Sequence, residues 1–320
     1  MQILFKELLN SGRVTTVPLT DIRVKLHVPC QWKCGFCHME GNHFSQPIEN
    51  DAAFSSALTN FRNQFGFKEV HYTGGEPSIH PQIVGLIARA KSLGFEVKMT
   101  TNGQTDPARY EECLSAGLSE INVSLHTLDG AALGAIMNPV KNPAWGERAI
   151  ARQLALIERL RTKLPVKINT AVGDNETEAL KIAGLAFSQG ISWRPMIILE
   201  QSETSYASLR RICTTLKAVP IDASITNGSS SCRINMKTPE GFTFNVKLLR
   251  EFFIPSMCEG CELHAAGKCY EYAYGPRIEM DKELLQIRNC VHKSTSNAVM
   301  TVGNYFNHQV ARDLLSALRA

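Results

Sequence analysis

The sequence predicts an α/β fold, in which an incomplete parallel barrel of six β/α units is followed by a small α+β extension. Two observations predict it. Apolar, strand-like runs alternate with helical stretches from residue 22 to residue 199, and such alternation favours a parallel sheet covered by helices. Beyond residue 200 the pattern changes to short strands, turns and clustered cysteines. We therefore divide the chain into a barrel, residues 1–200, and an extension, residues 201–320.

Six predicted strands alternate with five helical stretches in the barrel. The strands occupy residues 22–28, 68–77, 95–103, 119–129, 165–172 and 191–199. The helices occupy residues 51–65, 81–93, 107–116, 145–164 and 176–189. Because β/α barrels carry their active sites at the carboxyl ends of the strands, we expect the functional residues there.

The extension has a different pattern. Residues 226–251 read as turns and alternating strands, and residues 272–289 as a hairpin that returns Cys290 to three earlier cysteines. The last helix, residues 307–318, is expected to pack as a lid or a cap on the core.

Composition and charge exclude several classes of partner. The chain of 320 residues is 44% hydrophobic and has a formal net charge of +4, too slight to indicate a nucleic-acid or anionic-membrane surface. No window approaches the roughly 18 apolar residues of a membrane span, and the first ten residues carry no apolar leader core. We therefore expect a cytoplasmic protein with no nucleic-acid and no membrane partner.

Seven of the ten cysteines fall into two groups, and the other three, Cys113, Cys213 and Cys232, are expected to be buried thiols that pack as small hydrophobes. In a reducing compartment, clustered cysteines indicate metal. The first group, Cys30, Cys34 and Cys37, offers three thiolates. An iron–sulfur cubane would use them and leave one iron open. Zinc would need a fourth ligand, for which the nearby candidates are His27, His38 and His43.

The segment CQWKCGFC, residues 30–37, resembles the CxxxCxxC signature of the radical S-adenosylmethionine (SAM) superfamily. The resemblance implies a partial (β/α)6 TIM-like barrel and a 4Fe-4S cluster whose open iron binds SAM. An electron from the reduced cluster cleaves SAM to methionine and a 5′-deoxyadenosyl radical, which abstracts hydrogen from a substrate. The cofactor supplies this chemistry and the protein orients it. The resemblance also implies an electron donor such as flavodoxin or ferredoxin.

Further strand ends resemble the SAM-contacting elements of that family. The GGEP element implies that Gly74, Gly75 and Glu76 hold the methionine end of SAM, with glycines allowing close backbone approach. The other SAM-binding residues implied by the resemblance are Phe36, Thr101, Asn102, Ser124 and Asn169. For two of these residues a purely structural role stays open. Asn102 could form a turn before Gly103, and Asn169 could be a buried amide whose hydrogen bonds are made by the backbone.

A narrower resemblance links the chain to the MoaA branch, which begins molybdopterin synthesis from GTP and carries a second cluster. It rests on GRVTT at residues 12–16, on TGGEP, TTNG and the KIN strand, and on a carboxy-terminal cysteine group. The chain also departs from MoaA. It ends in LRA in place of a Gly-Gly tail, ELH follows Cys261 where MoaA has arginines, and His71 stands where MoaA offers an arginine. A triphosphate needs dense positive charge, so these departures argue against GTP.

The second cysteine group can close a metal site completely. Its members are Cys258, Cys261, Cys269 and Cys290. Four thiolates can ligate every iron of a 4Fe-4S cluster, which resembles the auxiliary cluster of twitch and SPASM extensions. Four cysteines also satisfy zinc, so this alternative stays open.

The sequence thus predicts a radical SAM enzyme that acts on a small polar metabolite, such as a sugar, a nucleoside or an amino-acid derivative. Polar residues at strand ends are the candidates for substrate binding: His71, His126, Lys167 and Arg194. No residue is assigned a catalytic role. A peptide-modifying radical SAM enzyme is the main alternative, although residues 1–21 before the first strand offer no added peptide-recognition domain. The others are a GTP-cyclising MoaA-type enzyme and a non-catalytic, metal-stabilised binding protein.

Overall fold

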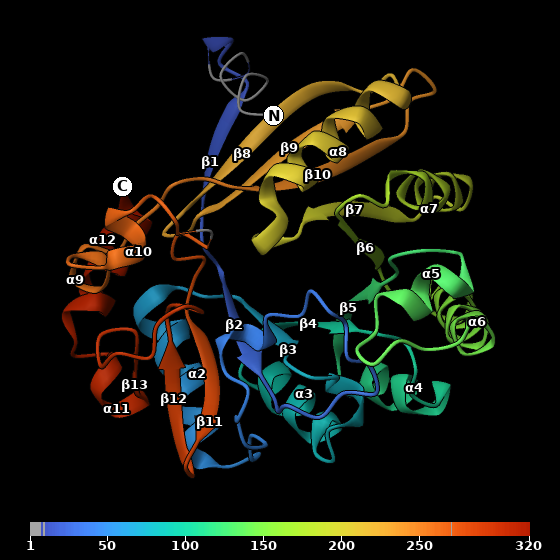
Figure 1. The fold of residues 1–320 in the computed structure, drawn as a ribbon. Helices are drawn as coiled ribbons and strands as arrows, with labels where there is room; N and C mark the ends of the chain where they lie inside the picture. Colours follow the sequence, from blue (N-terminus) through green and yellow to red (C-terminus); the bar gives the residue numbers. More distant parts are fainter. Residues whose placement is uncertain (1–7, 9, 270) are drawn as a thin grey trace.

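The computed structural model describes residue 8 and residues 10–269 and 271–320. Their strands form one sheet, in the order β1-β8-β9-β10-β7-β6-β5-β4-β3-β2-β11-β12-β13. The two ends of this order are not joined, so the sheet is open (Figure 1). The expectation that the first ten residues carry no leader concerns a segment that lies mostly outside the described residues.

Six neighbouring strands of the sheet are parallel and form the predicted incomplete barrel. They are β2 (Asp21–Lys25), β3 (Glu69–Thr73), β4 (Glu96–Thr101), β5 (Leu118–Ser124), β6 (Val166–Val172) and β7 (Ser192–Ile197). Each coincides with a predicted strand, so the α/β fold with six β/α units is confirmed.

Helices cover the outside of this barrel (Figure 1). The predicted ones are α2 (Ala52–Phe65), α3 (Ile83–Ser92), α4 (Pro107–Ser115), α6 (Pro143–Leu160) and α7 (Glu176–Ser188). Side chains cap three of their amino termini, because Asp51, Asp106 and Asn142 each accept a backbone N–H of the first turn. The sequence analysis did not predict α5 (Gly130–Ala135), which packs on α6.

The first part of the extension lengthens the sheet beyond β7. After helix α8 (Ser202–Thr215), strands β8 (Val219–Asn227), β9 (Ser231–Lys237) and β10 (Thr243–Leu249) follow, and β10 pairs in parallel with β7. The early strand β1 (Val14–Pro18) pairs with β8, more than 200 residues later in the chain. These strands rise above the barrel in Figure 1.

The second part of the extension lies at the opposite edge of the barrel, where β11 pairs in parallel with β2. The predicted hairpin is present as β11 (Arg277–Asp281) and β12 (Leu284–Arg288), followed by β13 (Val299–Thr301). The helices here are α9 (Pro255–Cys258), α10 (Glu262–Ala265), α11 (Val302–Tyr305) and α12 (Gln309–Arg319). The last helix, α12, packs on α9 and β8, as a cap. Three short 3-10 turns complete the fold: η1 (Met39–Gly41), η2 (Pro77–Ile79) and η3 (Leu199–Gln201).

The main core lies between the barrel strands and the helices outside them, and it includes Tyr72, Tyr110 and Trp193, all fully buried. An aromatic group joins the extension to it, since Phe61 of α2 contacts Tyr305 and Phe306 with ring centroids 5.6 and 5.0 Å apart. Among the described residues, none of the helices has the length and apolar character needed to cross a membrane.

Candidate active site

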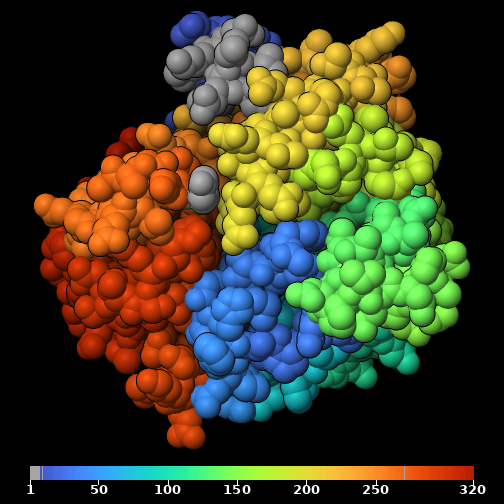
Figure 2. Space-filling view, in the orientation of Figure 1, coloured from blue at the N-terminus to red at the C-terminus, as the bar shows by residue number. Residues whose placement is uncertain are grey.

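The first cysteine group lies on the loop after β2, and the α5–α6 region holds this loop. Gly35 N–H donates to the carbonyl of Ile136 at 2.8 Å, and Asn138 N–H donates to that of Lys33 at 2.8 Å. Trp32 is buried in a small apolar cluster with Met137, which follows α5, and with residues of α5 and α6. In Figure 2 the loop, in blue, lies between the green α5–α6 region and the red carboxy-terminal part of the chain.

The three thiols of this loop lie close enough to affect one another. Burial raises the pKa of Cys34 to about 12, and Cys37 and Cys30 add to this shift. The Asn102 amide Nδ2 lies 3.6 Å from the Cys30 sulfur. Among the described residues, no three His, Cys, Asp or Glu side chains converge on a point for one metal ion. A cubane does not need such convergence, because each thiolate binds a different iron. Three soft thiols on one loop therefore fit a 4Fe-4S cluster.

Gly74 and Gly75 allow the end of β3 to approach the cysteine loop. Both have positive φ values, +82° and +37°. A Cβ on Gly75 would lie 2.1 Å from the carbonyl oxygen of Pro29, and a Cβ on Gly74 would lie 2.3 Å from Cγ of Lys25. Only glycine fits this cradle, because the chain's own Lys25 and Pro29 leave no room for a Cβ. Contact of the two glycines with SAM stays a prediction.

Glu76 lies beside this cradle, and its carboxylate is fully buried among donors. Oε1 accepts from Ser78 N–H, from the Ser78 hydroxyl and from the Thr101 hydroxyl, at 3.0, 2.6 and 2.7 Å. Oε2 accepts the Asn102 N–H at 2.6 Å. A carboxylate offers about four lone-pair sites, so Oε2 retains capacity for one more donor. Glu76 therefore aligns the ends of β3 and β4 and can still accept a ligand ammonium.

The other predicted SAM-binding residues surround the same region. The Phe36 ring contacts the His126 ring edge-on, with centroids 5.1 Å apart. Gln153 of α6, which sequence reasoning missed, donates to the carbonyls of both Asn102 and Ser124, at 2.9 and 2.7 Å. It fixes the ends of β4 and β5 relative to each other. Asn169 is buried, and its Oδ1 has no hydrogen-bond partner in the described part of the chain.

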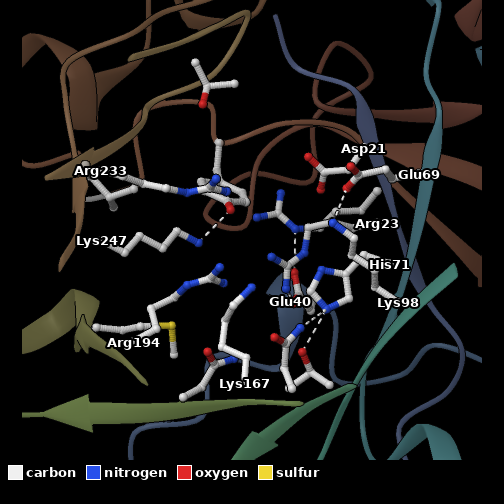
Figure 3. A pocket seen from close by; sticks show the side chains of 18 of the residues that line it. Asp21, Arg23, Glu40, Glu69, His71, Lys98, Lys167, Arg194, Arg233 and Lys247 are labelled. Atoms are coloured by element: carbon white, nitrogen blue, oxygen red, sulfur yellow. Dashed lines mark hydrogen bonds and ion pairs between the residues drawn. The ribbon is translucent and has the colours of Figure 1, made fainter. Parts of the chain in front are cut away.

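A cavity of about 470 Å³ opens inside the barrel, next to the cysteine loop. His38 and Glu40, which follow Cys37, form part of its wall. Most of the remaining wall is polar and comes from β2 to β7 and from the extension (Figure 3). The charged residues that line it are Asp21, Arg23, Glu40, Glu69, Lys98, Glu120, Lys167, Arg194, Arg233, Lys247, Glu271 and Arg277.

Three of the four predicted substrate-binding residues line this cavity. Lys167 donates to Glu120 at 2.9 Å, and Arg194 Nε donates to the Asn245 Oδ1 at 3.1 Å. The His71 Nε2 lies 2.8 Å from the Thr100 hydroxyl. Burial, with help from nearby Arg23 and Arg194, holds the His71 pKa well below its usual range, so this ring is neutral.

The fourth predicted substrate-binding residue, His126, lies outside the lining of the cavity. It is buried, and its Nδ1 accepts the Ala171 N–H at 3.2 Å. Burial lowers its pKa to about 4. Its ring contacts the ring of Phe36 in the cysteine loop, so His126 lies beside that loop and not in the cavity wall.

The second cysteine group gathers at the edge of the sheet, near α9. Burial raises the pKa of Cys258, and the thiols of Cys269 and Cys261 contribute to the shift. Burial also raises the pKa of Cys290 to about 11, again with a contribution from Cys269. Cys269 therefore lies within electrostatic reach of both Cys258 and Cys290, and Cys261 lies within reach of Cys258. This donor set fits a fully ligated 4Fe-4S cluster and also fits zinc.

A buried chain of ion pairs joins the two cysteine groups, and sequence reasoning missed it. Arg277 of β11 donates from Nε to Glu40 at 2.5 Å and from Nη2 to Glu271. Glu271 in turn accepts the backbone N–H of Val291, the residue after Cys290, at 2.7 Å. The loops also touch directly, because a Cβ on Gly41 would lie 2.5 Å from Cα of Val291.

The chain resembles known protein families in sequence. The profile of the Radical SAM superfamily matches residues 25–183. The chain is 28% identical over 259 residues to a probable GTP 3',8-cyclase of Saccharolobus solfataricus, a match that covers 76% of this chain and 78% of that protein. It is 34% identical over 111 residues to a probable GTP 3',8-cyclase of Thermococcus kodakarensis, but this match covers 35% of this chain and 36% of that protein.

Solved structures resemble the chain more distantly. The structure of Streptococcus suis SuiB bound to S-adenosylmethionine has a TM-score of 0.49 and 17% identity, and it covers 68% of this chain and 50% of that chain. The structure of anSMEcpe with bound AdoMet has a TM-score of 0.47 and 15% identity, and it covers 62% of this chain and 60% of that one. The chain thus spans about half the length of SuiB.

Proposed function

The chain belongs to the radical SAM superfamily, and from this we propose that it reductively cleaves SAM and abstracts hydrogen from a small polar metabolite in the barrel cavity. When bound, a reduced 4Fe-4S cluster supplies the electron that cleaves SAM to methionine and a 5′-deoxyadenosyl radical. The residues proposed to hold this cluster are Cys30, Cys34 and Cys37.

The chain's own side chains orient the cofactor. The Gly74–Gly75 backbone lies close beside the cysteine loop. Oε2 of Glu76 can accept a hydrogen bond from the ammonium group of the SAM methionine moiety. Thr101 and Asn102 are held to Glu76 by hydrogen bonds, so their role is to fix this wall. Phe36, Ser124 and Asn169 complete the proposed SAM site.

One observation carries the proposal for the substrate: the cavity of about 470 Å³ begins at His38 and Glu40, immediately after Cys37. A molecule bound there would lie next to the site proposed for SAM. The cavity volume is in the range of small-ligand pockets, and its wall is rich in charged and amide groups. These features favour a small polar metabolite over a peptide chain. His71, Lys167 and Arg194 are the proposed substrate contacts from the barrel.

The extension is proposed to bind a second, fully ligated 4Fe-4S cluster through Cys258, Cys261, Cys269 and Cys290. With every iron ligated by a thiolate, such a cluster would not bind the substrate through iron. The substrate would then depend on side chains of the cavity for its position. An external electron donor, such as a flavodoxin or a ferredoxin, would reduce the first cluster.

GTP cyclisation is a second candidate, because relatives matched over three quarters of the chain are named probable GTP 3',8-cyclases. Four of the seven Lys and Arg residues of the cavity are paired with carboxylates, which leaves less positive charge for a triphosphate.

A substrate panel separates these candidates. The reconstituted enzyme is incubated anaerobically with SAM, a reductant and one compound at a time, and 5′-deoxyadenosine is measured. We expect a small metabolite to stimulate its formation above the substrate-free rate, while GTP and linear peptides do not. Stimulation by GTP with a cyclised product would establish the second candidate, and stimulation by peptides alone would reject both.

A further inference from the structure

The charges that line the cavity are only partly balanced by one another. Four of the cations that line the cavity make ion pairs with carboxylates. Arg23 and Arg277 both pair with Glu40, and Arg277 also pairs with Glu271. Lys98 pairs with Glu69 at 2.6 Å, and Lys167 pairs with Glu120 at 2.9 Å. These four cations and four carboxylates neutralise each other. Of the charged lining residues, Asp21 and three cations then remain.

The three remaining cations, Arg194 of β7, Arg233 of β9 and Lys247 of β10, form what we call the cationic wall. None of them makes an ion pair with a carboxylate of the described residues. Figure 3 shows them extending into the cavity from one side, opposite Glu69 and Asp21. Arg194 and Arg233 are close enough that burial and Arg233 together lower the pKa of Arg194 to about 10.

Like charges gathered in one place repel each other, and the partial burial of Arg194 and Lys247 adds to the cost, whereas Arg233 is exposed. Asp21 offsets one of the three charges through space, so the wall retains a net charge of +2. A phosphate monoester carries about −1.5 to −2 charges at neutral pH. Its oxygens accept hydrogen bonds in a tetrahedral arrangement, which suits donors that come from three strands. The wall thus matches a phosphate monoester in both charge and donor direction.

In the same cavity, the side-chain oxygens of two amides have no hydrogen-bond partner among the described residues. Oδ1 of Asn122 and Oδ1 of Asn169 are buried and accept no hydrogen bond among the described residues. Buried polar atoms are nearly always hydrogen-bonded. Since these oxygens can only accept, a ligand that satisfies them must present hydroxyl or amine groups.

We propose that the substrate is a small phosphorylated metabolite, whose phosphate monoester binds to the cationic wall and whose hydroxyl or amine groups donate to Asn122 and Asn169. This inference rests on the proposed function and specifies its substrate class. A nucleoside triphosphate would bring more negative charge to the wall than its net charge of +2 can neutralise.

Tyr274, which lies in the segment between Cys269 and β11, can report on occupancy of the wall. Its hydroxyl accepts from Lys247 Nζ at 2.6 Å, and the guanidinium groups of Arg23 and Arg277 lie 5.5 and 5.9 Å from its ring centre. Burial alone would raise the Tyr274 pKa and Asp21 acts in the same direction, but Lys247 and Arg23 outweigh both and lower it to about 8. A dianion on the wall would offset that positive charge and raise the Tyr274 pKa.

The test is a titration of the reconstituted protein with inorganic phosphate, under anaerobic conditions, by calorimetry and by tyrosinate absorbance. We expect phosphate to bind and the tyrosinate signal to move to higher pH. Arg233→Gln and Lys247→Gln should each weaken phosphate binding about tenfold or more. Lys237→Gln is the matched control, because Lys237 is an exposed lysine at the end of β9 that does not line the cavity.

Equal phosphate affinity in the wild type and the two wall variants would overturn the inference, and so would the absence of phosphate binding. Binding of malonate without binding of phosphate would also overturn it, in favour of a dicarboxylate. The titration needs neither SAM nor a reduced cluster. A wild-type protein that binds no phosphate but forms 5′-deoxyadenosine normally would therefore reject this inference and leave the proposed function standing.

Discussion

Replacing Arg277 with methionine tests the buried connection between the two cysteine groups. The Arg277 side chain is 3% exposed and contacts Glu40 and Glu271, which are 9% and 2% exposed. Removing one partner of a buried ion pair typically costs about 3–5 kcal/mol, because the other charge is left buried and unpaired. Glu40 keeps its contact with Arg23 at 2.6 Å and Glu271 keeps the N–H of Val291. We therefore expect the free energy of unfolding to fall by about 3 kcal/mol, near the lower end of this range.

Anaerobic urea unfolding, followed by tryptophan fluorescence at equal iron content, measures this loss. Arg161→Met is the control, since the Arg161–Glu158 pair lies on the helix surface and exposed pairs contribute little. Adding Glu271→Gln to Arg277→Met should recover part of the stability, because Glu271 pairs with no cation other than Arg277 among the described residues and would otherwise stay buried with an unpaired charge. A single variant as stable as the wild type, or a double variant that is less stable than the single one, would refute the reasoning.

Three further predictions concern the cofactor sites and the cavity. Glu76→Ala should weaken SAM binding in equilibrium dialysis while iron content stays unchanged, and unaltered SAM affinity would remove Glu76 from the site. Tyr274 should ionise near pH 8 in difference absorbance against Tyr274→Phe. The folded pKa of Tyr274 lies below the unfolded value of about 10, so ionisation of Tyr274 increases the stability of the fold as pH rises from 8 to 10. This gain in stability is lost as pH falls through 8. A Tyr274 titration near pH 10 would contradict the assignment. Anaerobic reconstitution should give about eight irons per chain, counted as two cubanes. A content of four irons and one zinc per chain would show that the second cysteine group binds zinc and not an auxiliary cluster.

The barrel could be predicted because its signals are local. Each of its strands is a short apolar run next to a helical stretch, and β2 to β7 pair in chain order. Helix α8 was missed because its sequence, SETSYASLRRICTT, is rich in serine and threonine and buries few large apolar residues. Strand β1 was missed because it is short, mostly exposed and paired with β8, which is far along the chain.

The candidate site also has a part that local sequence patterns predict and a part that they do not. The cysteine loop, the glycine cradle and Glu76 follow from two short motifs, residues 30–37 and residues 74–77, and each motif can be read locally. The contact between Arg277 and Glu40 spans 237 residues, and no local pattern pairs them. Arg233 and Lys247 lie on strands of the extension, where the sequence offered alternating strands but no reason to direct either side chain at the barrel cavity.

The most direct test of the account is SAM cleavage by the anaerobically reconstituted protein. With SAM and a reductant, the wild type should form 5′-deoxyadenosine, detected by chromatography and mass spectrometry. The triple variant Cys30→Ala, Cys34→Ala, Cys37→Ala should form none, while Cys213→Ala, a buried cysteine of α8 outside both groups, should resemble the wild type. A triple variant that still forms 5′-deoxyadenosine, or a fully reconstituted wild type that forms none, would contradict the central claim.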